Sequence, residues 1–137
     1  MTEPHTELQM EQRNYTRLPI DVIVEIHLSD GTKLYGETAD ISLDGAFVIL
    51  IPPPGINLGD PCRLELIIKT SEGWVRVGFG CTIAHNKNDG IGLQFNRADT
   101  PHHESFLQLL IDGSNDIDGL LDELSRNPRK EFQFSND

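Results

Sequence analysis

Two short clusters of polar residues contain the side chains best suited to bind an anion. Arg13 and Arg17 are four positions apart, and Asp40, Ser42 and Gly45 follow about twenty residues later. On a strand, Asp40 and Ser42 are expected to project from one face, and Gly45 allows a turn that brings backbone amides near that face. Arginines bind phosphate and the O6/N7 edge of guanine, whereas a carboxylate accepts hydrogen bonds from guanine N–H groups. Together these residues predict a site that binds both parts of a nucleotide.

The chain carries a formal net charge of −11, and most of the excess lies near its two ends. Acidic residues outnumber Lys and Arg by 8 to 3 in residues 1–40, by 6 to 5 in residues 41–100 and by 8 to 3 in residues 101–137. Such a chain repels a polyanion at long range, so we expect no nucleic acid polymer among its partners. Arg13 and Arg17 can still bind one small anion, because charges further apart than roughly 8 Å are largely screened.

Size and composition indicate one soluble globular domain of 137 residues. No stretch of about 18 apolar residues is present, so no membrane span is expected. The first residues have neither the basic start nor the apolar stretch of a secretory signal. Cys62 and Cys81 are too few for a disulfide framework, and both alternate in phase with apolar neighbours. We therefore expect a cytoplasmic protein with two buried thiols.

Apolar residues alternate with polar ones in six stretches that are separated by turn signals. Strands are predicted over residues 20–28, 33–42, 46–51, 62–69, 74–85 and 91–95. This regular spacing is typical of a small antiparallel barrel or sandwich. Thr100 and Pro101 then predict the start of a helix that Gly113 ends, and a second helix is predicted over residues 116–125.

Catalytic and metal-binding motifs are missing from the sequence. There is no Gly-x-Ser-x-Gly elbow, no P-loop and no His-Glu-x-x-His motif. His102 and His103 are adjacent, so on a helix their side chains diverge by roughly 100° and form a poor metal pair. We therefore expect a protein that is not an enzyme and has no cofactor.

The two polar clusters and their order resemble the PilZ domain family, whose members bind the bacterial second messenger cyclic di-GMP. Arg13 and Arg17 match the first motif of that family, and Asp40, Ser42 and Gly45 match the second. The resemblance covers about residues 11–112 and includes Gly36, AFV after the motif glycine, and GIGLQF before a helix. It implies a six-stranded antiparallel β-barrel with a helix across its mouth.

The resemblance also implies a role for each motif residue. Arg13 and Arg17 would clasp phosphate and guanine from a flexible arm, and Asp40 would contact a guanine edge. Ser42 and the turn at Gly45 would support the phosphate side. Many relatives that bind an intercalated ligand dimer have an arginine where this chain has Gln12, so one or two ligands per chain remain possible.

We therefore expect a flexible arm (1–10), a PilZ-like barrel domain (11–112) and a C-terminal segment (113–137). The expected function is a non-enzymatic cyclic di-GMP receptor in which residues 11–18 become ordered on binding. The alternative is a PilZ-type adaptor that contacts other proteins and binds little or no ligand. An unidentified protein partner is expected in either case, and the C-terminal helix either folds back on the barrel or mediates a homo-oligomer. A barrel that binds single-stranded nucleic acid is disfavoured, because such proteins use a basic groove with aromatic platforms.

Overall fold

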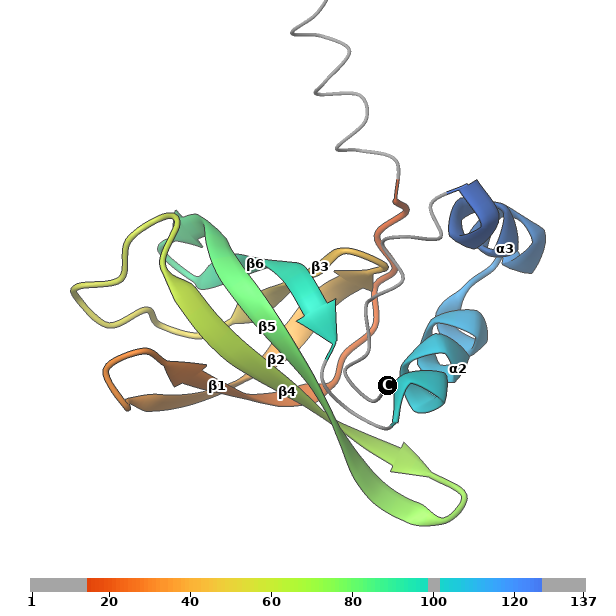
Figure 1. Ribbon diagram of the computed structural model, residues 1–137, viewed down its shortest axis with the longest axis horizontal. Helices are drawn as coiled ribbons and strands as arrows, with labels where there is room; N and C mark the ends of the chain where they lie inside the picture. The colour runs from red at the N-terminus through yellow and green to blue at the C-terminus, as the bar shows by residue number, and fades with distance from the viewer. Residues whose placement is uncertain (1–14, 99–101, 127–137) are drawn as a thin grey trace, which may run out of the picture.

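Six antiparallel strands close into a barrel in the structure, a computed structural model that describes residues 15–98 and 102–126 (Figure 1). The order around the barrel is β1-β2-β3-β6-β5-β4, and pairing of β1 with β4 closes it. The strands are β1 (Ile23–Leu28), β2 (Lys33–Ser42), β3 (Gly45–Ile49), β4 (Pro61–Thr70), β5 (Gly73–Lys87) and β6 (Gly90–Ala98). The predicted six-stranded antiparallel barrel is therefore confirmed.

The alternation of residue types decides which side chains fill the barrel. On β4, Cys62, Leu64, Leu66 and Ile68 are buried, whereas the residues between them are only half-buried. Successive side chains of a strand point to opposite faces, so one face of β4 lines the core and the other meets solvent. The hairpin that leads into β5 turns at Gly73, whose φ of 114° is readily adopted only by glycine.

Two helices follow the last strand: α2 (His103–Gly113) and α3 (Ile117–Arg126). α2 lies across one end of the barrel (Figure 1). There the fully buried Phe106 packs edge-on against Phe79 and Phe95, with ring centroids 5.0 and 6.0 Å away. Burial of these three aromatic side chains closes that end of the core. In the described part of the chain, no helix has the length and apolar character needed to cross a membrane.

The segment before β1 differs from the prediction, because the strand expected to begin at Ile20 begins at Ile23. Leu18 instead forms an isolated bridge with Ile41, in which each amide donates to the other's carbonyl oxygen at 2.8 and 2.9 Å. The Thr38 hydroxyl donates to the Ile20 carbonyl oxygen at 2.6 Å. Such hydrogen bonds between a side chain and the backbone take the place of the regular backbone hydrogen bonds of a β-ladder. We call residues 15–20 the arm segment; it runs between the strands and the helices (Figure 1).

The other predicted strand boundaries differ from the observed ones by at most three residues. β3 ends at Ile49 rather than at residue 51, just ahead of the prolines at 52–54, which cannot donate to a ladder. The predicted helix start at Thr100 and Pro101 lies outside the described residues. α2 begins at His103, with His102 at the N-cap position.

We predict that Gly36→Ala destabilises the barrel by about 1–3 kcal/mol, a typical cost of overpacking. A Cβ at position 36 would lie 2.6 Å from the Ile49 carbonyl oxygen and 3.0 Å from Val48 Cγ1. The matched control is Gly80→Ala on β5, where no described atom lies within 4 Å of the added Cβ. Urea denaturation should place Gly80→Ala within about 1 kcal/mol of the wild type. Equal effects of the two substitutions would contradict this packing argument.

Candidate ligand-binding site

The arm segment brings one arginine of the first cluster to the aspartate of the second. Leu18 and Ile41 form a bridged pair and both are buried, so their neighbours Arg17 and Asp40 point away from the core. Arg17 Nη1 donates to Asp40 Oδ1 at 2.7 Å, and the two side chains are 52% and 30% exposed. Two residues 23 positions apart thus form an ion pair at the surface. Arg13, the other predicted arginine, lies outside the described residues.

Ser42 is the last residue of β2, next to the turn into β3, and is only 1% exposed. Its hydroxyl donates to Asp44 Oδ1 at 2.9 Å and accepts from the Asp44 amide at 3.2 Å. The hydroxyl therefore helps to build the turn, whereas the Asp40 carboxylate reaches the surface. Although Asp40 and Ser42 were expected on one face, the structure places their side chains in different environments.

Gly45 is needed for a reason other than the one expected from the sequence. Among the described residues, the glycines with positive φ do not include Gly45, so it does not supply a left-handed turn. A Cβ at this position would lie 2.5 Å from the Leu93 carbonyl oxygen, because β3 and β6 pair closely here. Gly45 therefore allows two strands to approach, and the explanation based on turn conformation was wrong.

Two open grooves meet at Arg17. The larger has a volume of about 570 Å³ and passes Tyr15, Arg17 and Gly45 towards β5 and β6. The smaller has a volume of about 390 Å³ and is lined by Arg17, Asp40, Phe47, His85, Lys87, Asp89 and Gly92. Because Arg17, His85 and Gly92 line both grooves, one continuous surface extends from the arm segment to β5.

His85 and Lys87 are candidate site residues that the sequence motifs did not identify. A Cβ at Gly92 would lie 2.7 Å from His85 Cδ2, so the imidazole lies directly against the Gly92 backbone. Lys87 Nζ lies 5.8 Å from the centroid of the Phe47 ring, within cation–π range. Pairing of β6 with both β3 and β5 brings these residues together. Sequence spacing does not reveal which strands pair, although a glycine within a strand indicates that another part of the chain comes close to its backbone.

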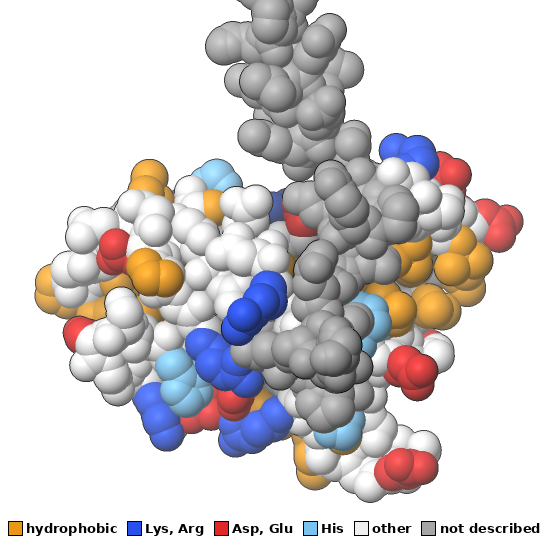
Figure 2. Space-filling view, in the orientation of Figure 1, with side chains coloured by type: hydrophobic (Ala, Val, Ile, Leu, Met, Phe, Trp, Pro, Cys, Tyr) orange, Lys and Arg blue, Asp and Glu red, His pale blue; other side chains and the backbone are white. Residues whose placement is uncertain are grey.

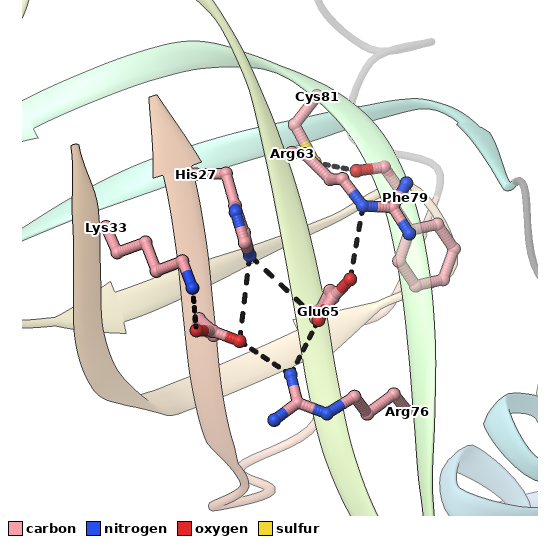
Figure 3. A network of polar contacts seen from close by, with 8 residues as sticks. His27, Lys33, Arg63, Glu65, Arg76, Phe79 and Cys81 are labelled. Atoms are coloured by element: carbon pink, nitrogen blue, oxygen red, sulfur yellow. Dashed lines mark hydrogen bonds and ion pairs between the residues drawn. The ribbon is translucent and has the colours of Figure 1, made fainter. Parts of the chain in front are cut away.

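A second charged cluster lies on the outer face of β1, β4 and β5 (Figure 3). Arg76 Nη1 donates to Glu25 Oε1 and to Glu65 Oε1, both at 2.6 Å. Glu25 is only 6% exposed, and its hydrogen bond from Arg76 holds the pKa of this carboxyl below its usual value.

This cluster also has the geometry of a possible metal site. Glu25, His27 and Glu65 present ligand atoms within 4.8 Å of one another. However, Arg76 bridges the two carboxylates, and Lys33 Nζ lies 3.7 Å from Glu25 Oε2. Their negative charge is therefore already balanced by protein cations. We assign the cluster to pairing across the strands rather than to metal binding.

Cys62 and Cys81 face each other across β4 and β5 as free, buried thiols. Burial raises the pKa of the Cys81 thiol well above its usual value, while a hydrogen bond with Cys81 lowers the pKa of Cys62. Because both lie in the core, they act as small apolar side chains rather than as accessible nucleophiles.

The fold and the site define a six-stranded antiparallel β-barrel in which the arm segment brings an arginine to an aspartate beside two open grooves. The sequence model of the PilZ domain matches residues 11–112. The chain therefore belongs to the PilZ domain family, which confirms the resemblance inferred from its motifs. No curated protein matches the sequence significantly.

Solved structures share the fold at low sequence identity. The PilZ domain of YcgR from Escherichia coli, determined with c-di-GMP, is 19% identical with a TM-score of 0.51, covering 85% of this chain and 96% of that one. The PilZ domain of CeSA from a cellulose-synthesizing bacterium is 20% identical with a TM-score of 0.50. The match covers 72% of this chain and 94% of that one. The Bacillus subtilis inhibitor of motility MotI/DgrA is 16% identical with a TM-score of 0.59, covering 72% of this chain and 49% of that one. The matched part of that inhibitor is thus about half of its length.

We predict that the Arg17–Asp40 ion pair contributes little to stability. Arg17→Ala should change the free energy of unfolding by less than about 1 kcal/mol, because exposed ion pairs are weak. Leu18→Ala is the comparison and should lower the free energy of unfolding by about 2–5 kcal/mol, since Leu18 is buried. Urea denaturation measures both. A loss above about 2 kcal/mol for Arg17→Ala would show that the pair holds the arm segment in place and is not available to a ligand.

Proposed function

We propose that this protein is a non-enzymatic receptor for cyclic di-GMP that acts in the bacterial cytoplasm. The observation that carries the proposal is the Arg17–Asp40 pair, 2.7 Å apart at the junction of two open grooves. Membership of the PilZ family and the likeness to a YcgR domain determined with c-di-GMP support this choice of ligand.

The charge of the described groove lining favours a ligand that both accepts and donates hydrogen bonds. Three carboxylates, Asp40, Asp44 and Asp89, are present beside two cations, Arg17 and Lys87. A simple anion that drew Arg17 away would leave Asp40 unpaired, which is unfavourable. Guanine offers O6 and N7 to an arginine and N–H groups to a carboxylate, so it can satisfy both partners at once.

Other residues of the grooves have supporting roles in this proposal. Lys87 would pair with a phosphate from the β5 side, and Arg13 would add a second cation from the arm. Ser42 would act indirectly, because its hydroxyl shapes the turn through Asp44. One ligand or an intercalated pair could occupy the grooves.

The proposed ordering of the arm concerns fewer residues than residues 11–18. Residues 15–18 are already placed by the Leu18–Ile41 bridge, whereas residues 11–14 lie outside the described part. Fixing the backbone costs roughly 1–2 kcal/mol per residue. The bridge at Leu18 therefore lowers the cost of holding the arm segment on a ligand.

A PilZ-type adaptor that binds other proteins remains the second candidate. α3 exposes Ile117 and Leu121 at 46% and 48%, and Figure 2 shows hydrophobic side chains gathered over the helices. Such a surface suits a protein partner or a second copy of this chain. An adaptor without ligand binding would give no heat on titration with cyclic di-GMP.

We predict that the wild type binds cyclic di-GMP and that Arg17→Ala weakens binding at least about tenfold, because each charge-assisted contact is worth about 1.5–3 kcal/mol. Isothermal titration calorimetry measures both the affinity and the number of ligands per chain. The control is Lys69→Ala, which removes a cation that lies over the Trp74 ring, 5.2 Å from its centroid. Absence of binding by the wild type at tens of micromolar, or equal losses in the two variants, would refute the proposed site.

We predict that Asp40→Ala reduces selectivity for guanine more than it reduces affinity for anions. The carboxylate accepts from guanine N–H groups and gives no contact to phosphate. Competition between cyclic di-GMP and cyclic di-AMP for the variant and the wild type measures the effect. An unchanged affinity ratio in Asp40→Ala would show that this carboxylate does not read the base.

A further inference from the structure

The C-terminal helix α3 is fastened to the arm segment by one buried carboxylate. Glu123 is only 7% exposed. Its Oε1 and Oε2 accept from the Thr16 amide at 3.1 and 3.2 Å, and Oε2 also accepts from the Thr16 hydroxyl at 2.5 Å. The two residues are 107 positions apart in the sequence. A helix at one end of the chain is thus bound directly to backbone at the other end.

A buried charge on this face of α3 needs these donors. Glu123 lies beside the buried Leu120 and the partly buried Leu124, which pack towards the core. An ionised carboxylate is costly to bury unless it is hydrogen-bonded. If Thr16 moves away, Glu123 loses these donors and needs water in their place, which weakens the attachment of α3 to the arm segment.

Thr16 is also the residue next to Arg17, so the arm segment serves two sites at once. Through Arg17 it contacts Asp40 beside the grooves, and through Thr16 it contacts Glu123. Adjacent Cα atoms are only about 3.8 Å apart. A ligand that shifts the backbone at Arg17 would therefore shift Thr16 as well.

A groove that is open to solvent runs along the contact between the arm segment and the helices. It has a volume of about 320 Å³ and is lined among others by Thr16, Pro19, Ser114, Leu120 and Glu123. A contact held by a few polar bonds beside such a groove can open at lower cost than a filled apolar one, because it loses fewer dispersion contacts.

We propose that the Glu123–Thr16 contact is autoinhibitory: it holds the arm segment where Arg17 pairs with Asp40, and binding of ligand at Arg17 releases α3. This inference rests on the proposed function as a cyclic di-GMP receptor. Release would uncover Leu120 and Leu124 next to the already exposed Ile117 and Leu121. Because coupling between two sites is reciprocal, weakening the α3 contact must strengthen ligand binding.

The test compares two variants that remove the same charge from neighbouring positions of α3. Glu123→Gln weakens the contact with Thr16, whereas Asp122→Asn neutralises an exposed carboxylate that pairs with Arg126. In calorimetry with cyclic di-GMP, Glu123→Gln should bind at least about fivefold more tightly than Asp122→Asn, since coupling of this kind typically changes affinity by that factor or more. Charge alone would affect both variants similarly.

A third variant weakens the contact without changing the charge, because the Thr16 amide still donates to Glu123. Thr16→Val keeps the branched side chain but loses the hydroxyl, and it should also bind more tightly than the wild type. In ligand-free protein, amide exchange of Thr16 and of α3 should be faster in Glu123→Gln than in Asp122→Asn. Circular dichroism verifies that each variant is folded.

The outcomes separate the two proposals. Suppose that the wild type binds cyclic di-GMP. If Glu123→Gln then binds no more tightly than Asp122→Asn, or if Thr16→Val binds no more tightly than the wild type, the autoinhibitory contact is refuted. The receptor function stands in both cases. Unchanged exchange of α3 on addition of ligand to the wild type would refute the autoinhibitory contact as well. If the wild type shows no binding, the receptor function fails, and the inference fails with it.

Discussion

The backbone bridge between Leu18 and Ile41 is the contact on which the proposed site depends. It holds the arm segment against the end of β2 with two hydrogen bonds of 2.8 and 2.9 Å, and both side chains are buried in the core. Because residues alternate on either side of this pair, Arg17 and Asp40 are forced to the surface together. The same placement turns Thr16 towards Glu123 of α3. One short stretch of chain thus joins the barrel, the grooves and the C-terminal helix.

The acidic character of the chain is compatible with binding an anionic nucleotide, because the relevant charges are local. The net charge of −11 lowers the long-range attraction of any anion, but screening limits that field to roughly 8 Å. Within the grooves, aspartates stand beside Arg17 and Lys87. This mixture disfavours simple anions and polyanions and favours a ligand that carries N–H donors beside its phosphates.

Alternation of residue types was sufficient to predict six antiparallel strands, because it records which face of each strand is buried. Alternation left a barrel or a sandwich open, and the barrel was implied by the resemblance to the PilZ family. The motifs also singled out Arg17 and Asp40, which the fold brings together as an ion pair. The sequence could not predict contacts that arise from strand pairing. His85 lies against Gly92 only because β5 and β6 pair in that register, and the role of Gly45 depends on the Leu93 carbonyl of a distant strand.

The contact between Glu123 and Thr16 was beyond prediction for a similar reason. A helix over residues 116–125 was predicted from the sequence, but a glutamate in such a helix normally indicates a solvent-exposed position. The direction in which α3 packs depends on the connection after Gly113, where a Cβ would lie 2.6 Å from Ile20 Cδ1. Only the folded chain shows that this acid meets the arm segment.

The central claim is that a ligand binds where the arm segment meets β2 and the ends of β5 and β6. A two-dimensional amide NMR titration of the full chain with cyclic di-GMP tests it most directly. We expect the largest shifts at Arg17, Asp40 and His85, with further shifts in α3 and hardly any change on the outer face around Arg76. Shifts concentrated around Arg76 and Glu65, or no shifts at saturating ligand, would contradict it.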